Sequence, residues 1–167
     1  MILGLNATSS PRVRALRPLL SGLIAGLVAC ASPPPPPPPT VVAATLQAAA
    51  KANPDVHNRP SPVVVRLYEL KSSAAFDAAD FLSLYERDLA TLGAEMGARE
   101  EFTLRPGESK LWEKTVGTDV RFIGVIAAFR NIERARWKTL IPVKPNTRNV
   151  VKILTDDIVV SGSVAVP

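Results

Sequence analysis

The side chains best suited to chemistry are few in this chain of 167 residues. Cys30 is its only cysteine and His57 its only histidine. A histidine-based metal site usually needs two or three imidazoles, and a nucleophilic triad needs a histidine beside its nucleophile. The adjacent acids Asp156 and Asp157 lie in a predicted turn, where we expect them to be solvated. The sequence therefore predicts no catalytic residue, no metal ligand and no cofactor.

An apolar segment, residues 19–29, directly precedes Cys30. Three arginines and no acidic residue come before this segment. About eleven apolar residues suit a secretory signal and are too few for a transmembrane helix. The sequence Leu27-Val28-Ala29-Cys30 resembles the bacterial lipobox, whose cysteine thiol receives a diacylglyceryl group before cleavage and whose new amino group is acylated afterwards. We therefore expect residues 1–29 to be removed and Cys30 to carry acyl chains such as palmitate. An ordinary secretory signal with an incidental cysteine is the alternative.

The positive charge of the chain is partly a property of this signal. The formal net charge is +5, but Arg12, Arg14 and Arg17 would leave with residues 1–29. No remaining basic run is interleaved with aromatic residues, so we expect no nucleic-acid partner. The densest basic stretch, residues 130–138, also contains Glu133, and we interpret it as a solvated turn. With no second cysteine to form a disulfide, the mature chain must be stabilised by its core.

Residues 33–39 are seven consecutive prolines. Such a run adopts polyproline II at about 3.1 Å per residue and so spans about 22 Å. We expect residues 30–40 to form a tether that holds the following domain, residues 41–167, away from a membrane. A neutral low-complexity segment is the alternative.

The part after residue 40 has the pattern of a mainly β domain. Short apolar runs alternate with turn residues about every ten positions, which is typical of a sandwich or barrel. The predicted strands are residues 40–50, 62–70, 101–105, 110–116, 120–129, 136–143, 147–154 and 158–160. The strand at 120–129 is nearly all apolar, which predicts burial on both faces. Residues 51–62 contain three prolines and form a predicted loop.

One helix is predicted at residues 77–92. Asp77 is the predicted N-cap, and Gly93 ends the helix. The apolar face would consist of Phe81, Leu84, Tyr85, Leu89 and Leu92, packed against a sheet. Trp112 and Trp137 fit either the core or a partner-binding face, and we favour the core.

An ordered series of motifs extends over residues 46–160. It comprises Asn53-Pro54-Asp55, residues 59–70 (RPSPVVVRLYEL), Ala79-Asp80-Phe81, residues 104–108 (LRPGE) and residues 122–130 (FIGVIAAFR). This series resembles the type VI secretion outer-membrane lipoprotein family, TssJ, also called VasD or SciN. The resemblance implies a two-layer β-sandwich of transthyretin-like type, with a small helical insertion after the second strand and no enzymatic activity.

The resemblance also implies a location and partners. It predicts a lipid-anchored protein on the periplasmic face of the outer membrane, which binds the periplasmic C-terminal domain of the inner-membrane protein TssM, with TssL in the same complex. The implied partner-contacting element is the loop at residues 51–61, with candidate residues Lys51, Asn53, Pro54, Asp55, His57, Asn58, Arg59 and Pro60. Some of these residues could instead only fix the turn. The other functions considered are an adaptor for a different envelope machine and a transthyretin-like domain that binds or hydrolyses a small ligand.

Overall fold

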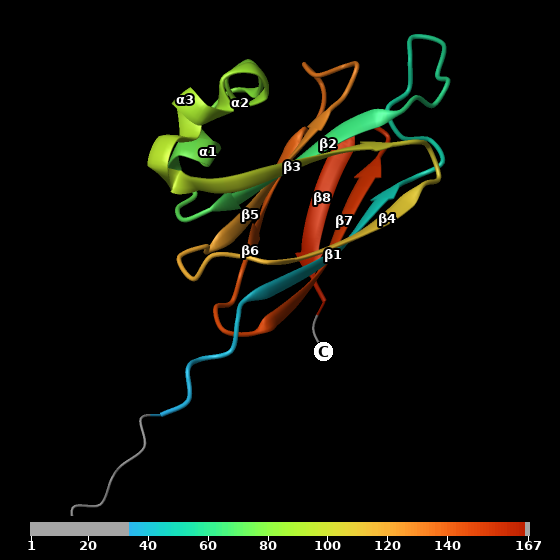
Figure 1. Cartoon of the computed structure of the whole chain (residues 1–167). Helices are drawn as coiled ribbons and strands as arrows, with labels where there is room; N and C mark the ends of the chain where they lie inside the picture. The colour runs from blue at the N-terminus through green and yellow to red at the C-terminus, as the bar shows by residue number, and fades with distance from the viewer. Residues whose placement is uncertain (1–33, 166–167) are drawn as a thin grey trace, which may run out of the picture. The chain divides into compact units, whose positions relative to one another are not determined.

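The computed structural model describes residues 34–165. Within this range the chain forms eight strands in two four-stranded sheets, which pack face to face as a sandwich (Figure 1). The mainly β two-layer fold expected from the sequence is confirmed. The predicted signal at residues 1–29, Cys30 and the first proline of the tether lie outside the described residues. No helix in the described range is long and apolar enough to span a membrane.

The first sheet, sheet A, contains the first strand of the domain in its interior. In spatial order it consists of β4 (Ser109–Thr115), β1 (Val41–Ala48), β7 (Arg148–Asp156) and β8 (Val159–Val164). Strand β1 is parallel to β7 and antiparallel to β4. It is therefore hydrogen-bonded along both of its edges.

The second sheet, sheet B, is antiparallel throughout. In spatial order it consists of β3 (Met96–Leu104), β2 (Val63–Leu70), β5 (Phe122–Ala128) and β6 (Lys138–Pro142). Three short helices, α1 (Ala74–Ala78), α2 (Phe81–Glu86) and α3 (Asp88–Leu92), follow β2, and a 3-10 turn, η1 (Gly93–Glu95), leads into β3.

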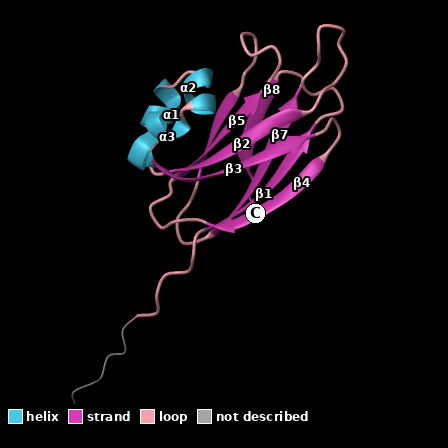
Figure 2. Cartoon of the chain, turned by 45° about the horizontal axis from the view of Figure 1, so that its top comes forward, coloured by secondary structure: helices cyan, strands magenta, loops and turns pink. Residues whose placement is uncertain are grey.

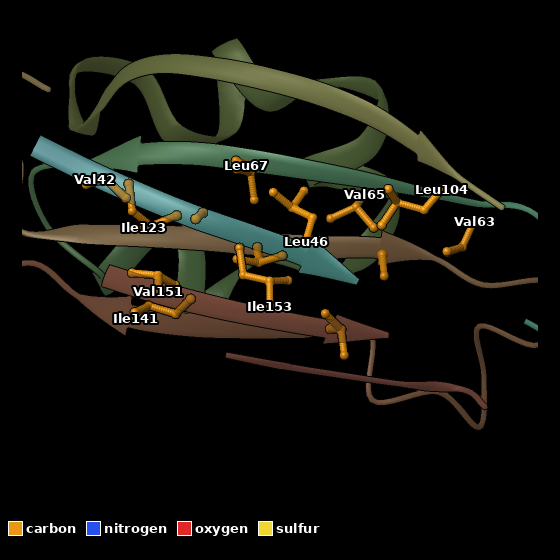
Figure 3. Packing of buried hydrophobic residues seen from close by; sticks show 14 of the residues in the cluster. Val42, Leu46, Val63, Val65, Leu67, Leu104, Ile123, Ile141, Val151 and Ile153 are labelled. Carbon is orange, nitrogen blue, oxygen red and sulfur yellow. The ribbon is translucent and has the colours of Figure 1, made fainter. Parts of the chain in front are cut away.

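The main core lies between the two sheets. Strand β1 alternates between half-buried and fully buried residues, as expected for a strand with one face on the core. Its inward side chains include Val42 and Leu46, which pack against residues of sheet B such as Leu67 and Ile123 (Figure 3). Small alanines alternate with these larger residues in β1 and let the two sheets approach closely.

The central strands of sheet B, β2 and β5, are buried on both faces, because the helices cover their outer side (Figure 2). Tyr68 and Leu70 of β2 point outward and pack against Phe76 of α1 and Leu84 of α2. Gly124 of β5 permits this contact, since a Cβ there would lie 2.8 Å from atoms of both Leu70 and Phe76. The near-continuous apolar sequence of β5 is thus explained by burial on two sides, as predicted.

The prediction of one helix over residues 77–92 is wrong, because the segment forms three short helices instead. Asp80, and not Asp77, caps a helix: its side chain accepts a hydrogen bond of 2.9 Å from the Ser83 N–H. This interaction stops the chain from continuing helically through residue 80. A second bend at Arg87 leaves Leu89 71% exposed, so this residue is not part of the apolar face. Gly93 ends α3 as expected, with a positive φ of 50°.

The predicted strands are confirmed with shifted ends. Strand β3 begins at Met96, five residues before the predicted start, in an Ala- and Gly-containing stretch with little intrinsic β preference. Strand β6 begins at Lys138, although Arg136 forms an isolated bridge with Val159 of the other sheet. Both tryptophans, Trp112 and Trp137, are half-buried and pack against the core, as favoured above.

A buried ionic cluster fixes the helices on sheet B. The guanidinium of Arg66, in β2, donates to Glu101 at 2.7 Å and to the carbonyl of Tyr85 at 2.8 Å. Its Nη1 lies 3.6 Å from the carboxylate of buried Asp88, which also pairs with Arg99. Burial in this cluster raises the pKa of Tyr68, whose hydroxyl donates to the carbonyl of Leu84 at 2.9 Å. The Arg66 guanidinium and the Tyr68 hydroxyl thus supply the hydrogen-bond donors for Glu101 and for the helix carbonyls of Leu84 and Tyr85.

We expect Arg66→Met to destabilise the domain by about 2 kcal/mol, because it leaves the carbonyl of Tyr85 without its donor, unpairs Glu101 and removes one of the two cationic partners of buried Asp88. The free energy of unfolding would be measured by urea titration with tryptophan fluorescence. Arg148→Met is the matched control: Arg148 pairs with Glu113 at the exposed surface, so its loss should change stability little. Equal unfolding midpoints for the two variants would contradict this role of Arg66.

Candidate functional site

Four connections gather at one end of the sandwich, which we call the four-loop end. They are the β1–β2 loop (residues 49–62), the β3–β4 turn, the β5–β6 loop (residues 129–137) and the β7–β8 turn; the first and third stand at the top of Figure 1. The strand register places them together, because Ala48 pairs with Thr155 and Val64 pairs with Ala128. Thr40, where the chain enters β1, lies at the opposite end of that strand.

Asn53 joins three of these connections. Its side-chain NH2 donates to the carbonyl of Pro62 at 2.7 Å, and its side-chain oxygen accepts from the N–H of Arg130 at 2.8 Å. Its own N–H donates to the carbonyl of Asp157 at 2.7 Å. The residue is 2% exposed and has a φ of 52°, which asparagine tolerates better than most residues. Asn53 therefore positions the loops and is not available to a partner.

The tip of the β1–β2 loop is closed by Asp55 and Arg59. The carboxylate of Asp55 accepts from the N–H groups of His57 and Arg59 at 2.8 and 2.9 Å, and from Arg59 Nε at 2.8 Å. The Arg59 N–H bond, followed by the guanidinium bond, lowers the pKa of Asp55 from 3.8 to about 2. These contacts hold a tight turn whose shape does not depend on a partner.

The closed tip presents three consecutive side chains to solvent: Val56, His57 and Asn58. Val56 is 93% exposed, which is unusual for a branched apolar residue. Asn58 has a φ of 60°, so its backbone conformation is part of the turn. The remaining sequence-predicted residues lie around the tip: Pro60 is exposed, Pro54 is half-buried, and Lys51 pairs with Asp156 at 3.8 Å.

The β5–β6 loop lies beside the β1–β2 loop, and the two together line a hollow of about 640 Å³. Residues 130–133 form its second wall, opposite Pro54, Val56 and Arg59. The sequence of residues 130–138, which predicts a solvated turn, does not reveal this wall. Its one detectable signal was an apolar residue, Ile132, within a basic loop. The juxtaposition itself depends on the register of β2 with β5, which no local pattern reveals.

The side chains at this end offer apolar and hydrogen-bonding surface. His57 makes no side-chain hydrogen bond within residues 34–165, and the adjacent Asp55 is engaged by Arg59. No group of three His, Cys, Asp or Glu side chains in the same range is arranged to hold a metal ion. Of the sequence-predicted contact residues, the structure separates Asn53, Asp55 and Arg59, which shape the loop, from the exposed tip.

Comparison with known families gives one match that covers most of the domain. The model of the family described as "Type VI secretion lipoprotein, VasD, EvfM, TssJ, VC_A0113" matches residues 40–157. No curated protein matches the chain at a comparable level of significance.

Solved structures agree with this family match. The T6SS lipoprotein TssJ1 from Pseudomonas aeruginosa is 33% identical with a TM-score of 0.75, over 78% of this chain and 99% of that chain. Lip from Serratia marcescens, described as a membrane-bound component of the type VI secretion system, is 25% identical with a TM-score of 0.70, over 77% and 99% of the two chains. A chain in a structure described as the TssM C-terminal domain from EAEC is also 25% identical, with a TM-score of 0.61, over 73% and 99%.

The low pKa of Asp55 gives a pH-dependence of the loop. A carboxyl whose pKa is depressed on folding stabilises the structure above its unfolded pKa, near 3.8, and loses this contribution as pH falls through the folded value of about 2. We therefore expect the backbone amide shifts of His57 and Arg59 in NMR spectra to titrate with a midpoint near 2. In Asp55→Asn this transition should be absent. A midpoint near 4 in the unaltered chain would show that the turn does not depend on the ionised carboxylate.

Proposed function

Because this chain belongs to the type VI secretion lipoprotein family that includes VasD, EvfM and TssJ, we propose that it joins the outer membrane to the periplasmic domain of TssM. The family consists of structural, membrane-bound lipoproteins of the secretion membrane complex, not of enzymes. In the proposal, Cys30 carries the acyl chains in the outer membrane, and the tip of the β1–β2 loop contacts TssM. TssL completes the same complex.

The observation that carries the proposal is the family match over residues 40–157, which includes the whole β1–β2 loop. The loop's geometry supports a binding role. Its turn is already closed by Asp55 and Arg59, so a partner would not have to order it, and the entropic cost of association is smaller. The similarity to a chain in the TssM C-terminal domain structure supports TssM as the partner.

The topology also supports a mechanical role. The tether enters β1 at Thr40, and the β1–β2 loop leaves the same strand after Ala48. Eight strand residues span about 25 Å, so the membrane attachment and the partner contact would lie at opposite ends of one strand. A force between the membrane attachment and the partner acts along the axis of β1. It is resisted by the backbone hydrogen bonds that β1 forms with both β4 and β7. Many hydrogen bonds must then break together, which suits a strand that transmits force.

The tip can be tested without disturbing the fold. The triple variant Val56→Ala, His57→Ala, Asn58→Gly keeps the structural Asn53, Asp55 and Arg59, and glycine tolerates the positive φ at residue 58. We expect it to bind the periplasmic domain of TssM at least about tenfold more weakly than the unaltered domain, as measured by calorimetric titration. A soluble domain starting after Cys30 suffices, because the solved relatives consist almost entirely of the matched part.

Leu111→Ala is the control for this experiment. Leu111 is 85% exposed on β4, away from the four-loop end, so its truncation removes a comparable apolar surface without touching the tip. Its affinity for TssM should equal that of the unaltered domain. Unchanged binding by the triple variant would rule out the tip as the TssM contact.

The membrane attachment is tested by Cys30→Ser. Without the thiol no thioether can form, so we expect the variant to be lost from the outer membrane and to stop supporting secretion, while it still binds TssM. Membrane fractionation, an effector secretion assay and a pull-down with the TssM periplasmic domain measure these three results, and mass spectrometry of the N-terminal peptide shows whether the native thiol is modified. An unmodified thiol in the native protein, or normal secretion by the variant, would contradict lipid attachment at this residue.

A further inference from the structure

The hollow between the β1–β2 and β5–β6 loops has walls that are fixed before anything binds. Asn53 holds the start of the β5–β6 loop through the N–H of Arg130. At the other end of that loop, the N–H of Arg136 donates to the carbonyl of Ile158 at 3.0 Å, and the carbonyl of Arg136 accepts from Val160 at 2.9 Å. Both loops are therefore tied to the sheets, and the hollow between them is preorganised.

Each wall contributes a branched aliphatic side chain. Val56 stands on the β1–β2 loop at 93% exposure, and the half-buried Ile132 lies on the β5–β6 loop. An apolar side chain seated between them would remove apolar surface of both walls from water. Buried apolar anchors near the centre of an interface contribute a large share of binding free energy.

The charges around the hollow are unevenly matched. Arg59 is neutralised by Asp55, at 2.7 Å. By contrast, no ion pair among residues 34–165 involves Arg130, Arg134 or Arg136, all on the β5–β6 loop. Glu133 is the only acid of that loop. The loop therefore keeps a net positive charge, three arginines against one acid, and Arg130 and Glu133 both line the hollow.

We propose that the hollow receives an acidic segment of the protein partner, with an apolar side chain between Val56 and Ile132 and a neighbouring carboxylate on Arg130. This inference rests on the proposed function, because the partner segment is assigned to the periplasmic domain of TssM. It adds a second loop to the contact surface and states the chemistry that the surface selects. An anionic lipid headgroup is the other ligand that arginines could take. The position of the hollow, at the end of β1 remote from the tether, favours the protein.

Two single variants of the β5–β6 loop test the proposal. Arg130→Glu reverses the charge that should meet the partner's carboxylate, and Ile132→Ala removes one apolar wall. Binding is measured by calorimetric titration of the soluble domain with the TssM periplasmic domain. We expect Arg130→Glu to bind about tenfold more weakly and Ile132→Ala about fivefold more weakly than the unaltered domain. The effect of Arg130→Glu should shrink at high salt, because an exposed ion pair is screened.

The controls are matched in side-chain type. Arg87→Glu makes the same reversal at an exposed position between α2 and α3, and Leu111→Ala truncates an exposed apolar residue of β4. Both should bind TssM within about twofold of the unaltered domain. Thermal unfolding of each variant shows whether a loss of affinity reflects a loss of folding. If Ile132→Ala unfolds at a lower temperature, the test of the proposal rests on Arg130→Glu, because the side chain of Arg130 is exposed and its replacement should not affect folding.

The outcomes separate this inference from the proposed function. If the tip triple variant weakens binding while Arg130→Glu and Ile132→Ala do not, the hollow is not occupied, and the assignment of TssM as partner stands. If the unaltered domain does not bind TssM at all, both are overturned. If Arg130→Glu instead abolishes binding to phosphatidylglycerol vesicles and leaves TssM binding intact, the hollow serves a lipid and the proposal is wrong.

Discussion

The burial of strands β2 and β5 on both faces is the constraint on which the architecture depends. Both strands have sheet A on one side and the helices on the other, so the side chain of Arg66 is only 8% exposed. It is instead surrounded by Glu101, Asp88 and the carbonyl of Tyr85. Burying charge is costly unless every group is paired, so the position of the helices is set by this polar geometry as much as by apolar packing. The helical insertion is thus a structural part of the domain.

The central strands of sheet B thus have no free face to offer, and the proposed partner contact lies at the ends of the strands. The strand order gives those ends different roles. One end receives the chain at Thr40, and the other carries four connections side by side. Because β1 is hydrogen-bonded on both edges, it links the two ends directly. Attachment and recognition can therefore be separated in space within one small domain.

The shape of the four-loop end depends on buried and hydrogen-bonded residues more than on the exposed ones. Asn53 is buried, yet it connects the β1–β2 loop to Pro62, Arg130 and Asp157. Asp55 and Arg59 in turn shape the tip that carries Val56. Rigid loops lose little conformational entropy on binding, so such internal hydrogen bonds contribute to affinity indirectly. The motif residues Asn53, Asp55 and Arg59 are thus explained by the shape of the loop, and the exposed residues proposed as contacts lie between and beside them.

The sequence by itself determined the mainly β class, the eight strands, the loop at residues 51–62 and the family, because alternating apolar residues, turn-forming prolines and ordered motifs are local signals. It misplaced the helical segment, since the apolar spacing encodes neither the cap that Asp80 forms with Ser83 nor the bend at Arg87. It also could not show that Asn53 and Asp55 shape the loop while the tip residues are exposed, or that Ile132 lies opposite Val56. Only the tertiary structure decided these points, because they depend on which loops the register of β1, β2 and β5 brings together.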